Sequence, residues 1–116
     1  MSFHFHIEER QACCVISIEG KFVDRGNEKN ILEEFDGSLA EGQRDFILDM
    51  KGMQLLNSEG INVLVRIVNI ANGKKARIVF VHVPDHIEEL LHVIKLNSVF
   101  IIKADLQDGL EYLKEQ

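Results

Sequence analysis

The most distinctive polar side chain in this sequence is the hydroxyl of Ser58, which stands between two apolar stretches. Residues 46–50 form an apolar run of strand length, and residues 61–71 form a strongly apolar stretch of helical length. A hydroxyl at the start of a helix lies beside the positive end of the helix dipole, where backbone N–H groups lack partners. Such a residue either caps the helix or marks a position where added charge is felt.

Two groups of histidines are the other candidates for chemistry. His82 and His86 span the end of a predicted strand and the start of a predicted helix, so their rings can approach in space. They have no carboxylate or cysteine at a fixed spacing nearby, which makes them a weak signal for catalysis. His4, His6 and Glu8 alternate on one face of the first predicted strand, and this trio has the donor types of a metal site. A half-exposed strand face explains the trio more simply, so we predict no metal site and no catalytic residue.

Cys13 and Cys14 are the only cysteines, and they are adjacent. Neighbouring residues on a strand point to opposite faces, so these two thiols cannot easily form a disulfide with each other. We expect both to be small core residues of a protein in a reducing compartment.

Composition and charge exclude several classes of function. The 116 residues are 46% apolar and 28% charged, which is typical of one folded domain spanning residues 1–116. The net charge of −6 argues against a nucleic-acid binder. No apolar run approaches the ~20 residues that span a bilayer, and no signal peptide is recognised, so we expect a cytoplasmic protein. No nucleotide-binding glycine motif and no nucleophile elbow occurs, so we predict neither an enzyme nor a cofactor.

Hydrophobic periodicity predicts an α/β fold with the element order β-β-α-β-α-β-α-β-α. A hairpin followed by alternating helices and strands favours a mixed, mostly parallel sheet with flanking helices. Strands are predicted at residues 3–8, 14–19, 46–50, 76–83 and 99–102. Helices are predicted at residues 27–40, 61–71, 84–94 and 105–113, and loops at residues 21–26 and 51–58.

Two of the predicted helices have well-defined patterns. The helix at residues 61–71 is apolar on most of its surface, with a narrow polar stripe of Asn62, Arg66 and Asn69. Such a helix is buried on much of its circumference or presents part of its surface to a partner. The helix that Pro84 is predicted to open, with the proline in its first turn, is predicted to bury the apolar stripe Ile87, Leu90, Leu91 and Ile94.

A phospho-aspartate receiver domain shares this layout and would use an aspartate such as Asp49. It also requires an acidic pair after a first strand that leads into a helix. Here the first strand ends in Glu8 and Glu9 and continues into a second strand, so we reject this alternative.

Residues 46–53 and 56–61 resemble the signature of STAS domains, the anti-sigma factor antagonist family. In that family an apolar strand ends in an aspartate, and a short loop leads to Asp-Ser-x-Gly at the start of an apolar helix. Residues 78–84, 94–100 and 105–113 are also similar to the family, and Ser58-x-Gly60 is the most specific part.

The resemblance implies a phosphorylation switch. An unphosphorylated member binds an anti-sigma factor that is also its serine kinase, and this binding frees the sigma factor. Phosphorylation of the loop serine breaks the complex, and a serine phosphatase restores it. By position, Ser58 is the implied phosphoacceptor, and Asn57, Ser58, Glu59 and Gly60 form the implied partner-binding loop. ATP and the groups that transfer phosphate then belong to the partner.

The sequence departs from the family at one position of this loop. The residue before the serine is commonly aspartate, and here it is Asn57, which keeps the shape and the capping ability but loses the charge. An alternative therefore stays open, in which the chain is a STAS subunit of a membrane transport or signalling complex and Ser58 is a structural helix cap.

Overall fold

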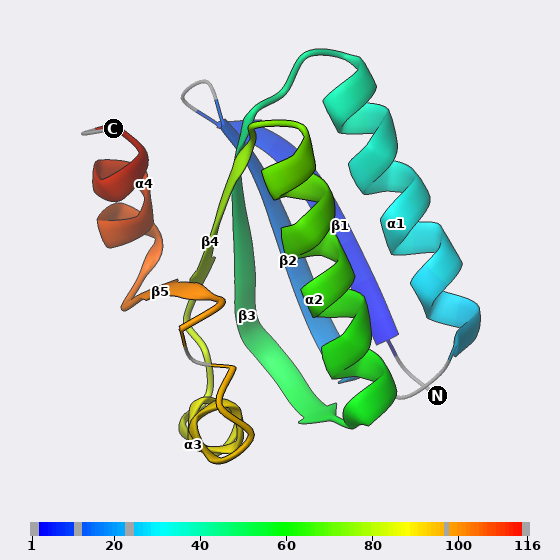
Figure 1. Cartoon of the computed structure of the whole chain (residues 1–116), viewed down its shortest axis with the longest axis vertical. Coiled ribbons are helices and arrows are strands. Elements are labelled where there is room, and N and C mark those ends of the chain that lie inside the picture. The colour runs from blue at the N-terminus through cyan, green and yellow to red at the C-terminus, as the bar shows by residue number, and fades with distance from the viewer. Residues whose placement is uncertain (1–2, 11–12, 23–24, 97, 115–116) are drawn as a thin grey trace.

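A five-stranded sheet with the strand order β1-β2-β3-β4-β5 forms the centre of the computed structural model (Figure 1). The structure describes residues 3–10, 13–22, 25–96 and 98–114. The elements are β1 (Phe3–Arg10), β2 (Cys13–Phe22), α1 (Arg25–Ala40), β3 (Asp45–Leu56), α2 (Ser58–Gly73), β4 (Arg77–Val81), α3 (Asp85–Val93), β5 (Ile101–Lys103) and α4 (Leu106–Lys114). Strands β1 and β2 pair antiparallel, and all other neighbouring strands pair parallel. The predicted fold class and element order are confirmed.

Helices lie on both faces of the sheet, and each face has its own hydrophobic core. Figure 1 shows α1 and α2 side by side on one face and α4 on the other. The larger core lies between the sheet and the α1–α2 layer, and the smaller one lies beneath α4. Cys14 belongs to the larger core and Cys13 to the smaller one, and both side chains are buried, on opposite faces of β2 as the strand alternation predicts.

Helix α2 contributes much of the larger core. Leu64 and Ile67 are completely buried, while the predicted polar stripe of Asn62, Arg66 and Asn69 is exposed. Burying a large aliphatic side chain stabilises the fold by roughly 1.5–3 kcal/mol, so this apolar face holds the helix on the sheet. Among the described residues, no helix has the length and apolar character needed to cross a membrane.

Strand β3 is longer than predicted, and the predicted loop at residues 51–58 is wrong. The strand continues to Leu56 and stays parallel to β2, which itself continues beyond Gly20 to Phe22. Register shifts between Ser17 and Glu19 and between Gly20 and Lys21 mark bulges along this pairing. A bulge breaks the two-residue alternation on which strand prediction depends, so the second half of β3 looks like a loop in the sequence.

Smaller corrections apply to the second half of the chain. Strand β4 ends at Val81, two residues before the predicted end, because His82 has a positive φ of 54°. Pro84 precedes α3 rather than opening it, and Ile94 is 41% exposed instead of buried. The last strand begins at Ile101 rather than at residue 99.

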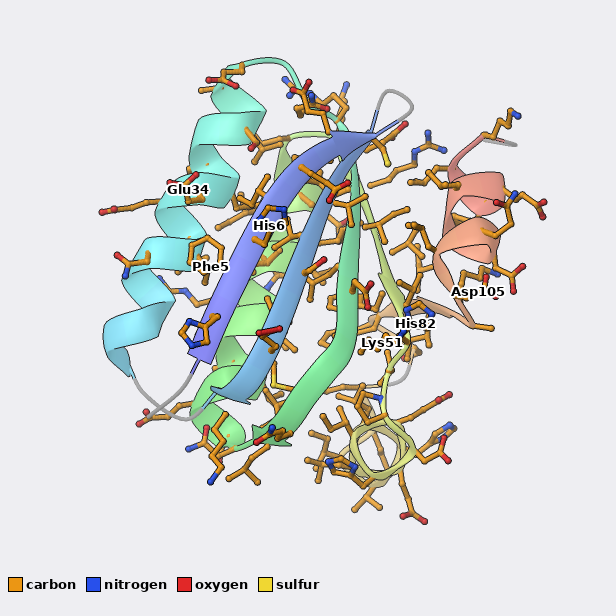
Figure 2. The ribbon with its side chains drawn as sticks, turned by 180° about the vertical axis from the view of Figure 1, so that it is seen from behind. Phe5, His6, Glu34, Lys51, His82 and Asp105 are labelled. Atoms are coloured by element: carbon orange, nitrogen blue, oxygen red, sulfur yellow. The ribbon has the colours of Figure 1, made fainter. Side chains whose placement is uncertain are left out.

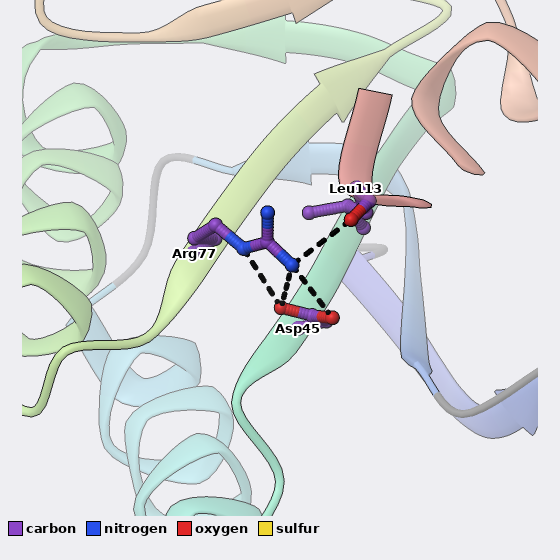
Figure 3. A network of polar contacts seen from close by, with 3 residues as sticks. All are labelled: Asp45, Arg77 and Leu113. Atoms are coloured by element: carbon purple, nitrogen blue, oxygen red, sulfur yellow. Dashed lines mark hydrogen bonds and ion pairs between the residues drawn. The ribbon is translucent and has the colours of Figure 1, made fainter. Parts of the chain in front are cut away.

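A polar clamp joins the start of β3, the start of β4 and the end of α4 (Figure 3). Arg77 Nε donates to Asp45 Oδ1, and Arg77 Nη2 donates to Asp45 Oδ2, both at 3.0 Å. The same Nη2 donates to the backbone oxygen of Leu113 at 3.0 Å. Asp45 and Arg77 are register partners on adjacent strands. Because the same guanidinium also binds the backbone oxygen of Leu113, it holds the end of α4 against the sheet.

Candidate functional site

Ser58 is the first residue of α2, at the point where β3 has just ended. Leu56 is the last residue of β3, so only Asn57 lies between the strand and the helix. The Ser58 side chain is exposed, and among the described residues its hydroxyl forms no hydrogen bond. The candidate phosphoacceptor therefore stands at the N-terminus of a 16-residue helix, where the helix dipole favours negative charge.

The cap of α2 is Asn57 and not Ser58. Asn57 has the extended backbone of an N-cap residue, and its Oδ1 accepts a hydrogen bond from the backbone N–H of Gly60 at 3.0 Å. Its backbone oxygen accepts the first helical hydrogen bond from Ile61 at 2.9 Å. The prediction that Ser58 is a structural helix cap is therefore wrong, because the neighbouring asparagine fills that position. The alternative of a STAS subunit in a membrane transport or signalling complex does not depend on this cap and stays a prediction.

The four predicted loop residues differ in what they present to solvent. Asn57, Ser58 and Glu59 are exposed, whereas Gly60 is buried and donates its N–H to the cap. Gly60 therefore stabilises the loop through its backbone N–H and is not part of the exposed surface. Glu59 places a negative side chain beside Ser58 in the first turn.

Three further residues, one on β3 and two on α2, extend this surface beyond the predicted loop. Leu55, which no sequence pattern distinguishes, is 48% exposed near the end of β3. Along α2, Asn62 and Arg66 follow Ser58 at intervals of four residues, which places all three on one exposed helix face. The polar stripe of α2 thus begins at Ser58, a relation visible in the sequence once the helix start is known.

A second polar site joins His82 to a carboxylate that sequence reasoning did not connect to it. His82 Nδ1 lies 3.1 Å from Asp49 Oδ1, and the same oxygen accepts a hydrogen bond from the backbone N–H of Lys51 at 2.9 Å. Figure 2 shows His82 and Lys51 close together on the reverse side of the sheet. The pair orients one imidazole nitrogen, but among the described residues no hydroxyl or thiol hydrogen-bonds to the ring, so no nucleophile completes a catalytic arrangement.

The other histidine candidates are not assembled into a site. The side chain of His86 is exposed on α3 and forms no hydrogen bond or ion pair within the described part of the chain. His6 Nε2 lies 3.7 Å from Glu8 Oε1 on the exposed face of β1. No group of three His, Cys, Asp or Glu side chains in the described ranges has the geometry of a metal site.

The buried thiol of Cys14 is also unsuited to chemistry. Burial raises its pKa, a hydrogen bond with Ser38 lowers it, and the nearby charge of Glu9 raises it, with a net upward shift. A raised pKa keeps the thiol protonated, and a thiol is a much weaker nucleophile than a thiolate.

Comparison with known proteins identifies the family and the fold of the chain. The family model of the STAS domain matches residues 4–109. An anti-sigma factor antagonist from Mycobacterium paratuberculosis is similar in structure, with a TM-score of 0.83, 18% identity, and coverage of 97% of this chain and 95% of that chain. The anti-sigma factor antagonist SpoIIAA in its unphosphorylated form has a TM-score of 0.80, 12% identity, and coverage of 97% and 98%.

A third structural neighbour is a serine-to-glutamate variant of RsbS from Moorella thermoacetica, with a TM-score of 0.76, 17% identity, and coverage of 96% of this chain and 95% of that chain. No curated protein matches the chain by sequence. At these identities the structural likeness is one of fold, and the family match spans nearly the whole chain. The chain therefore belongs to the STAS domain family.

Proposed function

We propose that this STAS protein is an anti-sigma factor antagonist whose binding is switched by phosphorylation of Ser58. The observation that carries the proposal is the exposed Ser58 hydroxyl at the start of α2, which is not used to cap the helix. The antagonists among the structural neighbours support an anti-sigma factor as the partner. The family resemblance implies that this partner also has serine kinase activity. A serine phosphatase would restore the binding form, and such a pathway operates in the cytoplasm.

The proposed switch acts by changing the charge of a binding surface. A phosphate adds about −1.5 to −2 charges at pH 7. Weakening a complex a hundredfold requires roughly 2.8 kcal/mol, at about 1.4 kcal/mol per tenfold. A doubly charged group placed beside Glu59 inside a desolvated contact is sufficient for a change of this size.

Because Asn57 and not Ser58 caps α2, phosphorylation of Ser58 would not disturb the hydrogen bonds that stabilise the fold. Asn57 holds the start of α2 through Gly60, so the Ser58 hydroxyl can be modified without removing a hydrogen bond of the fold. The helix N-terminus stabilises the added phosphate within the domain. The modification therefore acts on the partner surface, which includes the exposed side chains of Leu55 and Glu59.

The proposal is tested by incubating the protein with ATP and each histidine-kinase-like ATPase encoded in the same genome. We expect one ATPase to bind the unmodified protein and to add a single phosphate, which mass spectrometry locates on Ser58. Ser58→Asp is expected to weaken binding at least about tenfold, and Ser58→Ala is expected to bind normally and to remain unmodified. Ser98→Asp, which places the same charge at an exposed serine elsewhere, serves as the matched control.

If no ATPase of this type binds or modifies the protein, and if Ser58→Ala and Ser58→Asp behave alike, the switch is refuted.

A further inference from the structure

A hollow opens on the sheet face that points away from α1 and α2. It is lined by His4 of β1, Glu19 and Gly20 of β2, and Gly52 and Gln54 of β3, and its volume is about 330 Å³. On β1 and β2, Phe5 and Ile18 point toward the larger core, so the alternating His4 and Glu19 point to the opposite side. In the reverse view of Figure 2, α4 lies beside β4, and no described helix covers β1 and β2.

The floor of the hollow is built by the bulged pairing of β2 and β3. His4, Glu19 and Gly52 are register neighbours across three strands, and the β2–β3 register shifts just before Glu19. A Cβ atom at Gly52 would lie 2.6 Å from Glu19 Cβ, a distance that real structures do not tolerate. The same position lies 3.6 Å from Glu19 Oε2, so the missing side chain at residue 52 allows the Glu19 carboxylate to lie over the backbone of β3.

The side chains around this floor are rich in hydrogen-bond acceptors. Glu19 offers a carboxylate, Gln54 a carboxamide oxygen and His4 a ring nitrogen. Within the described part of the chain, none of these three side chains forms a hydrogen bond or an ion pair, and the lining includes no lysine or arginine. An anion would be repelled by Glu19, and an apolar group would remove the carboxylate from water without compensation.

We propose that this hollow binds an organic cation that carries N–H donors, namely a guanidinium or a primary ammonium group. Its volume lies at the lower end of small-ligand pockets, which suits one extended side chain or one small amine. A planar guanidinium donates in parallel to carboxylate and carboxamide oxygens, and the net charge of −6 favours the approach of a cation. The cation has two sources, a free small amine or the arginine or lysine side chain of a protein. This site is independent of the switch at Ser58.

The test is an NMR titration of the uniformly ¹⁵N-labelled protein with n-butylguanidinium, and with neutral n-butylurea as the matched control. We expect dose-dependent shifts of the Gly20 and Gly52 amide signals with the guanidinium in the millimolar range, and none with the urea. Glu19→Gln removes the charge at an exposed position and is expected to weaken binding about tenfold. Glu33→Gln makes the same change on the exposed face of α1 and is expected to bind like the unaltered protein.

A second titration distinguishes the two sources. If an acetyl-Ala-Arg-Ala-amide peptide binds at least as tightly as n-butylguanidinium, the natural occupant is a protein side chain. If the peptide binds more weakly, the occupant is a free amine. Gln54→Ala provides a second variant that leaves the charge in place and is expected to weaken binding severalfold. The proposal is overturned if the two glycine signals do not move, if the urea moves them equally, or if Glu19→Gln binds as tightly as Glu33→Gln.

Discussion

The imidazole of His82 and the carboxylate of Asp49 meet at 3.1 Å although the two residues lie 33 positions apart in the chain. Asp49 pairs in register with Val81, the residue just before His82, so the parallel alignment of β3 and β4 brings them together. The contact holds His82 where its φ is 54°, a conformation that asparagine, aspartate and histidine adopt more often than other non-glycine residues and that β-branched residues avoid.

The first prediction concerns this turn. His82→Val introduces a β-branched residue at positive φ and also removes the contact with Asp49, so it is expected to destabilise the fold by about 1–3 kcal/mol. Asparagine tolerates the same backbone conformation, so His82→Asn is expected to lose clearly less free energy of unfolding than His82→Val. Urea unfolding of both variants measures the difference, and equal losses would show that the backbone conformation is unimportant.

The second prediction assigns the helix cap. Asn57→Ala removes the acceptor of the Gly60 N–H and is expected to lower the free energy of unfolding by about 1 kcal/mol. Ser58→Ala is expected to change it by less than about 0.5 kcal/mol, because this hydroxyl makes no hydrogen bond within the described residues. Asn57→Asp retains the cap and should be as stable as the unaltered chain. A larger loss for Ser58→Ala than for Asn57→Ala in thermal unfolding would reverse the assignment.

The third prediction concerns the clamp between Asp45 and Arg77. Arg77→Lys keeps the charge but loses the fork that contacts both oxygens of Asp45 and the backbone of Leu113. Because both side chains are about one-third exposed, solvent weakens the ion pair, and we expect a loss of about 1 kcal/mol. Hydrogen exchange should accelerate in α4 and remain unchanged in α2. Uniform acceleration in both helices would mean that the clamp stabilises the whole fold rather than the position of α4.

The fourth prediction uses the raised pKa of Cys14. Burial keeps this thiol protonated in the folded protein, whereas in the unfolded chain it ionises near its ordinary pKa of 9.0. The folded pKa is the higher one, so the related stability is fully present below pH 9.0 and is lost as the pH rises toward the folded value. Denaturant unfolding between neutral and alkaline pH should therefore show a steeper loss of stability for the unaltered protein than for Cys14→Ala. Parallel pH profiles of the two proteins would contradict this account.

The features that follow from local patterns could be predicted from the sequence. The exposed stripe of Asn62, Arg66 and Asn69 follows from helical periodicity, and the separation of Cys13 from Cys14 follows from strand alternation. These patterns depend only on the geometry of one element, so no knowledge of the neighbouring elements is needed.

The features that depend on two elements could not be predicted. The pairing of His82 with Asp49 requires the register of two parallel strands, and the extension of β3 to Leu56 requires the bulged pairing with β2. The helix start was predicted only approximately, because Asn57 and Ser58 are both good N-cap residues. Only the backbone geometry distinguishes these two neighbours.

The short distance between β3 and α2 has a consequence for the kinetics and strength of recognition. Leu56 is still paired with Phe22 in the sheet, and the helix begins two residues later, so Ser58 is held by regular structure on both sides. A flexible loop would lose conformational entropy of about 1–2 kcal/mol for each residue that a partner orders. Here most of that entropy has already been lost on folding, so the proposed partner would meet a preorganised serine and could engage it without waiting for a loop to rearrange.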